Sequence, residues 1–147
     1  MVLDSQVGTD FVDPKNSYLK MRVSPNVDSK FISGSVANVI NRVLVRTRTG
    51  KEICRVENAN LLAKFSQLYA CETDWQTTLG VSQGYGNETV PAAGKTFILP
   101  LWCIPCFNVD KLLPPQMTTG LRIEITLESP QVAFGDTAVA SYTFDRS

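Results

Sequence analysis

The sequence contains no histidine, and this absence removes the most common general base and the most common metal ligand. It also excludes any Ser-His or Cys-His pair for nucleophilic catalysis. An enzyme built on this chain would have to use carboxylate, lysine or thiol chemistry instead.

Net charge is also lacking, because 14 Lys and Arg residues are balanced by 14 Asp and Glu residues. The densest basic group fits an exposed strand face and its turn, and consists of Arg42, Arg46, Arg48 and Lys51. A nucleic-acid-binding domain usually carries a more pronounced basic patch. We therefore expect no specific nucleic-acid partner.

Long apolar runs are missing as well. No stretch of about 18 apolar residues is present, so we expect no membrane span. Residues 1–6 have neither the basic region nor the apolar core of a secretory signal. Four cysteines without such a signal are typical of reduced thiols in a cytoplasmic setting.

The clearest positive pattern is the strict alternation over residues 120–128. Gly120 opens this stretch and Pro130 closes it. Apolar side chains at every second position predict a strand with one buried and one solvated face. The apolar positions are Leu121, Ile123, Ile125 and Leu127, and the polar ones are Arg122, Glu124, Thr126 and Glu128.

Similar patterns predict further strands. Residues 17–24 place Leu19, Met21 and Val23 on one face. The remaining candidates are 37–48, 52–57, 96–102 and 138–144. Pro100 assigns the strand at 96–102 to a sheet edge or a bulge, because proline cannot donate to the ladder.

Only one segment has helical periodicity. The apolar residues that recur about every 3.6 positions are Leu61, Phe65, Leu68 and Tyr69, which predicts one helix of about ten residues. The glycine-rich residues 73–95 predict a long surface loop, or a short strand near 79–81. Residues 110–115 predict a turn or one-turn helix that is stopped by Pro114 and Pro115.

These elements predict an all-β fold, an antiparallel sandwich with one short helix between strands, because strands and helices do not alternate. Residues 1–16 form an N-terminal arm in this interpretation, and residues 17–147 form a single domain. A chain of 147 residues can bury about 68–70% of its unfolded surface, which is enough for one core.

The sharpest chemical motif is Cys103-Ile-Pro-Cys106. A C-x-x-C sequence after an apolar strand resembles a thioredoxin-type site, in which a helix N-terminus activates the first thiol. Here the prolines at 114 and 115 leave no room for a long helix, and no βαβ unit precedes the motif. The alternative function is nevertheless a thiol–disulfide oxidoreductase that uses Cys103 and Cys106.

Other sites are weaker in the sequence. Cys54 and Cys71 could complete a zinc site with Cys103 and Cys106, but structural zinc usually requires two closely spaced pairs. The carboxylates Glu52, Glu57, Glu124 and Glu128 fit solvated strand faces, and the glycines at 80, 84 and 86 do not form a phosphate loop. We therefore expect no catalytic residue, cofactor or metal.

A third alternative is a sandwich-type binding module, for instance a lectin-like one. Its support is the aromatic pair Trp75 and Tyr85 in the 73–95 segment. The same two rings could anchor that segment to the core.

The order of sequence blocks resembles a known family. The blocks are FVDPKNSYL at 11–19, GKEI at 50–53, VENANLL at 56–62, FILPL at 97–101, LLPP at 112–115 and GLRIEI at 120–125. This succession is similar to the N-terminal jelly roll of double-jelly-roll major capsid proteins of virophages, Polinton-like viruses and related large DNA viruses. The resemblance covers most of residues 11–144.

The resemblance implies a structural role without catalysis. It implies a jelly-roll building block of an icosahedral shell, which is assembled in the host cell, becomes part of the virion and associates into a trimeric capsomer with other capsid proteins. A complete family member has a second jelly roll, which this sequence lacks. The strand at 121–127 would be the seventh of the first roll, and we expect its eighth strand to be missing.

Overall fold

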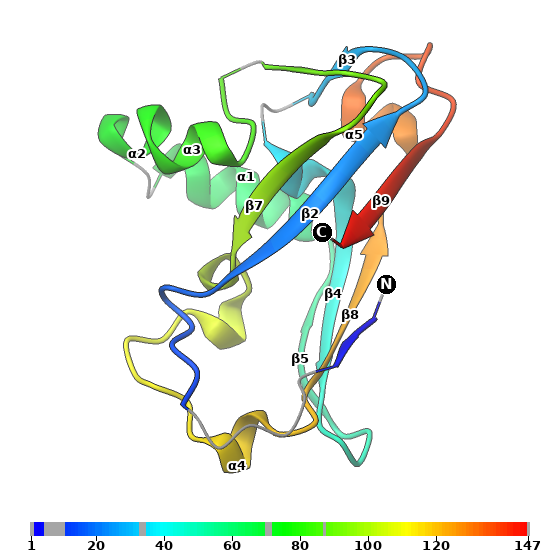
Figure 1. The fold of residues 1–147 in the computed structure, drawn as a ribbon. Helices are drawn as coiled ribbons and strands as arrows, with labels where there is room; N and C mark the ends of the chain where they lie inside the picture. The colour runs from blue at the N-terminus through cyan, green and yellow to red at the C-terminus, as the bar shows by residue number, and fades with distance from the viewer. Residues whose placement is uncertain (1, 5–10, 33–34, 70–71, 87, 147) are drawn as a thin grey trace.

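The structure is a computed structural model that describes residues 2–4, 11–32, 35–69, 72–86 and 88–146. The chain forms three antiparallel sheets, with short helices at their ends and along one side (Figure 1). The predicted β-rich antiparallel architecture is therefore confirmed.

The elements follow one another along the chain as strands with intervening short helices. The strands are β1 (Val2–Asp4), β2 (Tyr18–Pro25), β3 (Ser29–Lys30), β4 (Ile40–Arg46), β5 (Glu52–Val56), β6 (Thr89–Val90), β7 (Lys95–Pro100), β8 (Arg122–Leu127) and β9 (Tyr142–Arg146). The helices are α1 (Ala59–Tyr69), α2 (Thr73–Thr77), α3 (Leu79–Ser82), α4 (Pro115–Thr118) and α5 (Pro130–Phe134), with 3-10 turns η1 (Val36–Val39), η2 (Leu101–Cys103) and η3 (Pro105–Phe107).

The first sheet has the strand order β7-β2-β9. Met21 and Val23 of β2 are almost completely buried, which confirms the predicted face of that strand. Met21 lies opposite Phe97 of β7, so two large core side chains meet across the ladder. β7 is an edge strand and ends at Pro100, where a missing N–H costs no ladder bond.

The second sheet has the order β1-β8-β4-β5. Ile123 and Ile125 of β8 are buried, and they lie opposite Val45 and Val43 of β4. The alternation over 120–128 is thus confirmed as one buried face and one more exposed face. β1, from the N-terminal arm, adds to the outer edge of β8.

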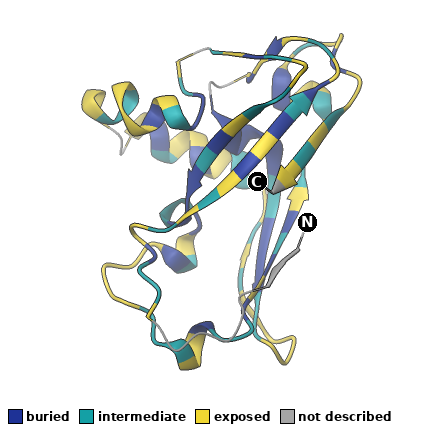
Figure 2. Cartoon of the chain, in the orientation of Figure 1, coloured by how far each residue is buried: buried dark blue, intermediate teal, exposed yellow. Residues whose placement is uncertain are grey.

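One continuous apolar core joins these two sheets (Figure 2). Phe31 connects its parts, because its ring packs edge-on to Phe97 and stacks on Phe134 of α5, each with centroids 5.3 Å apart. Burying these aromatic rings supplies a large share of the hydrophobic stabilisation.

The fold also contains a nested pairing between early and late strands. β2 pairs with β9, and β4 pairs with β8, both antiparallel and in different sheets. β9, which follows β8, corresponds to the strand predicted at 138–144. β9 begins at Tyr142, later than the predicted start at 138, because residues before it form a turn in which Asp136 accepts from the Ala138 amide at 2.9 Å.

Other predicted boundaries need correction. Residues 36–39 form η1 and do not belong to the strand, because Ser35 caps this turn by accepting from the Ala37 amide at 3.2 Å. The single predicted helix is α1, but the described residues contain four further short α-helices. Pro115 begins α4 instead of ending a helix, since proline is tolerated at the first helical position.

The segment 73–95 is neither a structureless loop nor a strand near 79–81. It contains α2 and α3, followed by the two-residue strand β6. Thr77 and Thr78 donate hydrogen bonds to the Asp74 carbonyl at 3.1 and 2.6 Å, which satisfies a carbonyl in these short helices. Among the described residues, no helix is both long and apolar enough to cross a membrane.

Candidate functional site

Two of the cysteines lie together in space. Cys54 comes from β5 and Cys106 from η3, and their side chains are hydrogen-bonded to each other. Both are free thiols and half-buried, as is Cys103. The Cys-Ile-Pro-Cys motif itself spans η2 and η3, so the long helix of a thioredoxin-type site does not follow it.

The environment of Cys106 opposes nucleophilic use. Desolvation, and then the neighbouring Cys54, raise the pKa of the Cys106 thiol to about 12. Reactive cysteines have a lowered pKa, because the thiolate is the nucleophile. At neutral pH Cys106 therefore stays protonated, as in a packed structural thiol.

We expect Cys106 to be alkylated slowly. Its thiolate population at pH 8 should be at least roughly a hundredfold lower than that of an ordinary cysteine, and its rate should rise steeply only toward strongly alkaline pH. Iodoacetamide labelling of the folded protein, followed by peptide mass spectrometry, measures this rate.

The variant Cys54→Ser is the matched control for that measurement. Burial is the larger cause of the raised pKa and Cys54 the smaller one, so Cys106 should stay slow in this variant. Labelling of Cys106 at the rate of a free thiol at pH 7 would contradict this description and favour the oxidoreductase alternative.

The zinc alternative involves the same cysteines. Within the described part of the chain, no three His, Cys, Asp or Glu side chains gather closely enough to hold a metal. Cys71, the fourth predicted ligand, lies outside the described residues. Among the described residues, the structure brings Cys54 and Cys106 together.

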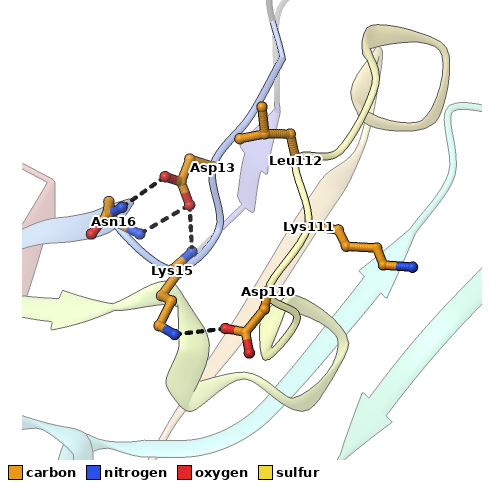
Figure 3. Close-up of a pocket in the computed structure, with 6 residues that line it drawn as sticks. All are labelled: Asp13, Lys15, Asn16, Asp110, Lys111 and Leu112. Carbon is orange, nitrogen blue, oxygen red and sulfur yellow. Dashed lines mark hydrogen bonds and ion pairs between the residues drawn. The ribbon is translucent and has the colours of Figure 1, made fainter.

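An open hollow of about 220 Å³ lies between the end of the N-terminal arm and the segment before α4 (Figure 3). Its centre is an ion pair between Lys15 Nζ and Asp110 Oδ1 at 2.7 Å, with both side chains mostly exposed. Asp13 accepts from the Asn16 side chain at 2.7 Å, and that hydrogen bond holds the pKa of Asp13 below its ordinary value. Lys111 points away from the pair.

This hollow has little capacity for chemistry. Asp13 and Asp110 already face donors of their own chain, and exposed ion pairs contribute little binding energy because water screens them. The hydrogen bonds of Asp13 fit a turn motif that orders the chain before β2.

The binding-module alternative rests on two aromatic residues that contact each other. Trp75 and Tyr85 pack edge-on with centroids 5.5 Å apart. Gly80 lies against the Trp75 ring, since a Cβ there would come within 3.1 Å of it. The two rings therefore join α2 to the turn that follows α3, and they do not form an open stacking platform.

The charged residues of the second sheet lie on its outer face. Arg46 of β4 contacts Glu124 of β8 at 3.5 Å, and Arg55 contacts Glu57 at 3.1 Å. Leu44 is buried in the same row of the sheet, so the long neighbouring side chains cover it.

Glu52 and Glu124 lie on strand faces, as predicted. Glu57 and Glu128 lie just beyond the ends of β5 and β8, and the half-buried Glu128 accepts a hydrogen bond from the Asn41 side chain at 2.6 Å.

A small, partly open space lies beneath α1. Its volume is about 20 Å³, which is room for roughly one water molecule. Its lining is almost entirely apolar, so we expect it to be dry. The lining residues are Ala37, Ile40, Val43, Ala59, Ala63, Leu99, Cys103 and Ile104.

The most unusual surface is the outer side of α1. Four large apolar side chains on this one helix are more than half exposed: Leu61, Phe65, Leu68 and Tyr69. Scattered exposed apolar residues are normal, but a contiguous group indicates a contact surface. The helical periodicity identifies these residues in the sequence, although it does not reveal that they face outward.

A scan against models of protein families found no match. A search of the curated proteins likewise found no related sequence.

Proposed function

We propose that this protein is a structural subunit, a jelly-roll building block of a viral shell that acts through contacts between copies. In a jelly roll a long antiparallel hairpin is rolled up, so that its first strand pairs with its last and its second with the last but one. Among the strands of five or more residues, β2 is the first and β9 the last, and β4 is the second and β8 the last but one. The nested pairs β2–β9 and β4–β8, in two different sheets, are the observation that carries the proposal.

The surface chemistry is compatible with a role in association. The clearest contact surface is the apolar side of α1, and large exposed apolar groups are typical of protein interfaces. The Cys106 thiol is protonated at neutral pH because its pKa is raised to about 12, and the Lys15–Asp110 hollow is neutralised by its own ion pair. The order of sequence blocks provides the additional resemblance to capsid proteins.

Electron microscopy and sedimentation of the purified chain over a concentration series test the proposal. We expect discrete oligomers, with trimers among them, and larger assemblies at high concentration. Monomers alone at every concentration, in a sample whose spectra show the folded protein, would contradict a shell-forming role.

A separate measurement tests the jelly roll itself. Cross-strand amide contacts in NMR spectra should connect Val23 with Phe144 and Val43 with Ile125, which are register partners in the nested pairs. If the first contact is missing while the second is present, β9 is not rolled against β2, and the jelly-roll proposal fails.

A further inference from the structure

Helix α1 is packed with its amphipathic pattern reversed. Its buried residues are Ala63, which is 7% exposed, and Gln67, which is 3% exposed. Leu61, Phe65 and Leu68 on the opposite side are each about 60% exposed. A surface helix normally buries its large apolar side chains, so this face is built to contact something outside the fold.

The exposed face is continuous and ordered by its own contacts. Leu61, Phe65 and Leu68 follow the 4-3 spacing of a helix–helix seam, and Leu62 and Tyr69 flank it. The Phe65 and Tyr69 rings already pack with centroids 4.5 Å apart. Such preformed aromatic anchors lose little conformational entropy on binding.

The size of the face suits a dimer. Five side chains that expose on the order of 100 Å² each give roughly 500 Å² per subunit, or about 1,000 Å² in total, which reaches the lower bound for specific interfaces. The patch of roughly 500 Å² on one subunit is also as large as the largest apolar patch on a typical monomer.

We infer that this face binds a second copy of the same chain, with the two α1 helices antiparallel about a two-fold axis at Phe65. At about 100° per residue, Leu61 and Leu68 lie on one flank of Phe65, and Leu62 and Tyr69 lie on the other. In that arrangement Leu61 faces Leu68 of the second copy, Leu62 faces Tyr69, and Phe65 faces Phe65. Every large apolar side chain therefore meets another one, which is the self-complementarity that an isologous contact requires.

The charges of α1 also favour a second copy of the chain over a membrane surface. Lys64 is the only charged residue of α1, and it lies about 100° around the helix from Phe65, at the edge of the face, so no charge lies within the apolar contact. A helix that lies on a membrane surface usually carries several basic residues beside its apolar face. With a single lysine, α1 fits a protein surface better than an anionic lipid surface.

This inference deepens the proposed function, and it rests on that function for the self-association of the chain. Sedimentation of the whole chain tests the α1 interface. We expect dimers in the wild type at micromolar to tens-of-micromolar concentrations. Phe65→Glu should weaken dimerisation at least about a hundredfold, because it places two carboxylates on the axis, while the thermal transition of the dilute protein stays unchanged. Met117→Glu, at a position on α4 that is 63% exposed, is the matched control and should leave the dimer intact.

A rescue experiment tests the antiparallel orientation. Leu61→Lys and Leu68→Glu should each weaken the dimer. The double variant Leu61→Lys/Leu68→Glu should regain at least about tenfold of that loss, because each new ammonium group then faces a new carboxylate. A double variant no better than the single ones would overturn the orientation.

The same variants separate the two proposals. If the wild type and Phe65→Glu form identical oligomers, the α1 interface is wrong while the proposed shell function stands. If dimers depend on Phe65 but nothing larger forms, the α1 interface stands while the shell function is wrong. A wild type that remains monomeric up to about 200 µM, or that binds neutral and anionic vesicles through Phe65 without dimerising, overturns the α1 interface.

Discussion

Replacing Phe97 by alanine should lower the free energy of unfolding by about 3–5 kcal/mol. Phe97 is 1% exposed and stands at the contact between β7, β2 and Phe31. The substitution removes most of a fully buried aromatic side chain and leaves a cavity, so the loss combines the transfer free energy with a cavity penalty. For a domain of this size such a loss is a large part of the total stability.

The surroundings of Phe97 leave little room for relaxation. Its ring lies directly against the backbone of Gly84, where a Cβ would come within 2.8 Å of Phe97 Cε1. Gly84 also has a φ of +77°, a conformation that suits glycine and holds the chain in place. The cavity therefore cannot close by a simple shift of this loop, and the expected cost lies toward the upper part of the range.

Urea unfolding monitored by circular dichroism measures this effect. Phe65→Ala is the matched control, because Phe65 is 60% exposed and its truncation in dilute solution should change stability by less than about 0.5 kcal/mol. Equal losses for the two variants would show that Phe97 does not occupy the core.

The strands were predictable where one face is buried and the other is solvated. β2 and β8 satisfy this condition, and their alternation identifies both the strands and their inner faces. The same rule fails in β4, where Val43, Leu44 and Val45 are all buried, because the outer face is covered by long side chains of neighbouring strands. The sequence pattern of one strand carries no information about which side chains of neighbouring strands cover it.

The short helices were not predictable for a different reason. α2 and α3 together span few residues and include threonine and glycine, so their intrinsic helix propensity is low. They are held by the contact between Trp75 and Tyr85. Such stabilisation comes from tertiary packing, which local sequence patterns do not record.

The chemistry of the cysteines also depended on tertiary structure. The motif drew attention to the pairing of Cys103 with Cys106, whereas the thiol in contact with Cys106 is Cys54 from β5. No spacing rule connects two residues so far apart in sequence. The raised pKa of Cys106 follows from burial, and it could not be read from the motif.

The reversed packing of α1 is the clearest limit of sequence periodicity. The spacing of Leu61, Phe65 and Leu68 correctly predicts the helix, but it does not say which face the fold covers. The fold covers the face with Gln67, whose Nε2 donates to Ser35 Oγ at 2.9 Å and to Gln83 Oε1 at 3.3 Å. A buried amide with two partners can thus replace an apolar contact and orient the helix.

Replacing Gln67 by leucine should therefore destabilise the protein by about 2 kcal/mol, although leucine is more hydrophobic. The substitution leaves the Gln83 oxygen, which is fully buried, without its donor. Gln83 Nε2 already has no hydrogen-bond partner among the described residues, so the whole amide of Gln83 would then be unsatisfied. Ser35 Oγ still accepts a hydrogen bond from the Ala37 amide, so its lost bond should contribute less than that of Gln83 to the loss of stability.

The double variant Gln67→Leu/Gln83→Leu distinguishes this explanation from a simple packing defect. Removing both amides eliminates the orphaned groups, so the double variant should be more stable than Gln67→Leu alone, with a coupling of about 1 kcal/mol. Lys64→Leu on the exposed side of α1 is the control for a change of helix propensity. Additive losses in chemical denaturation would mean that Gln67 and Gln83 do not act as a pair, and the orientation of α1 would then rest on the small size of Ala63 instead.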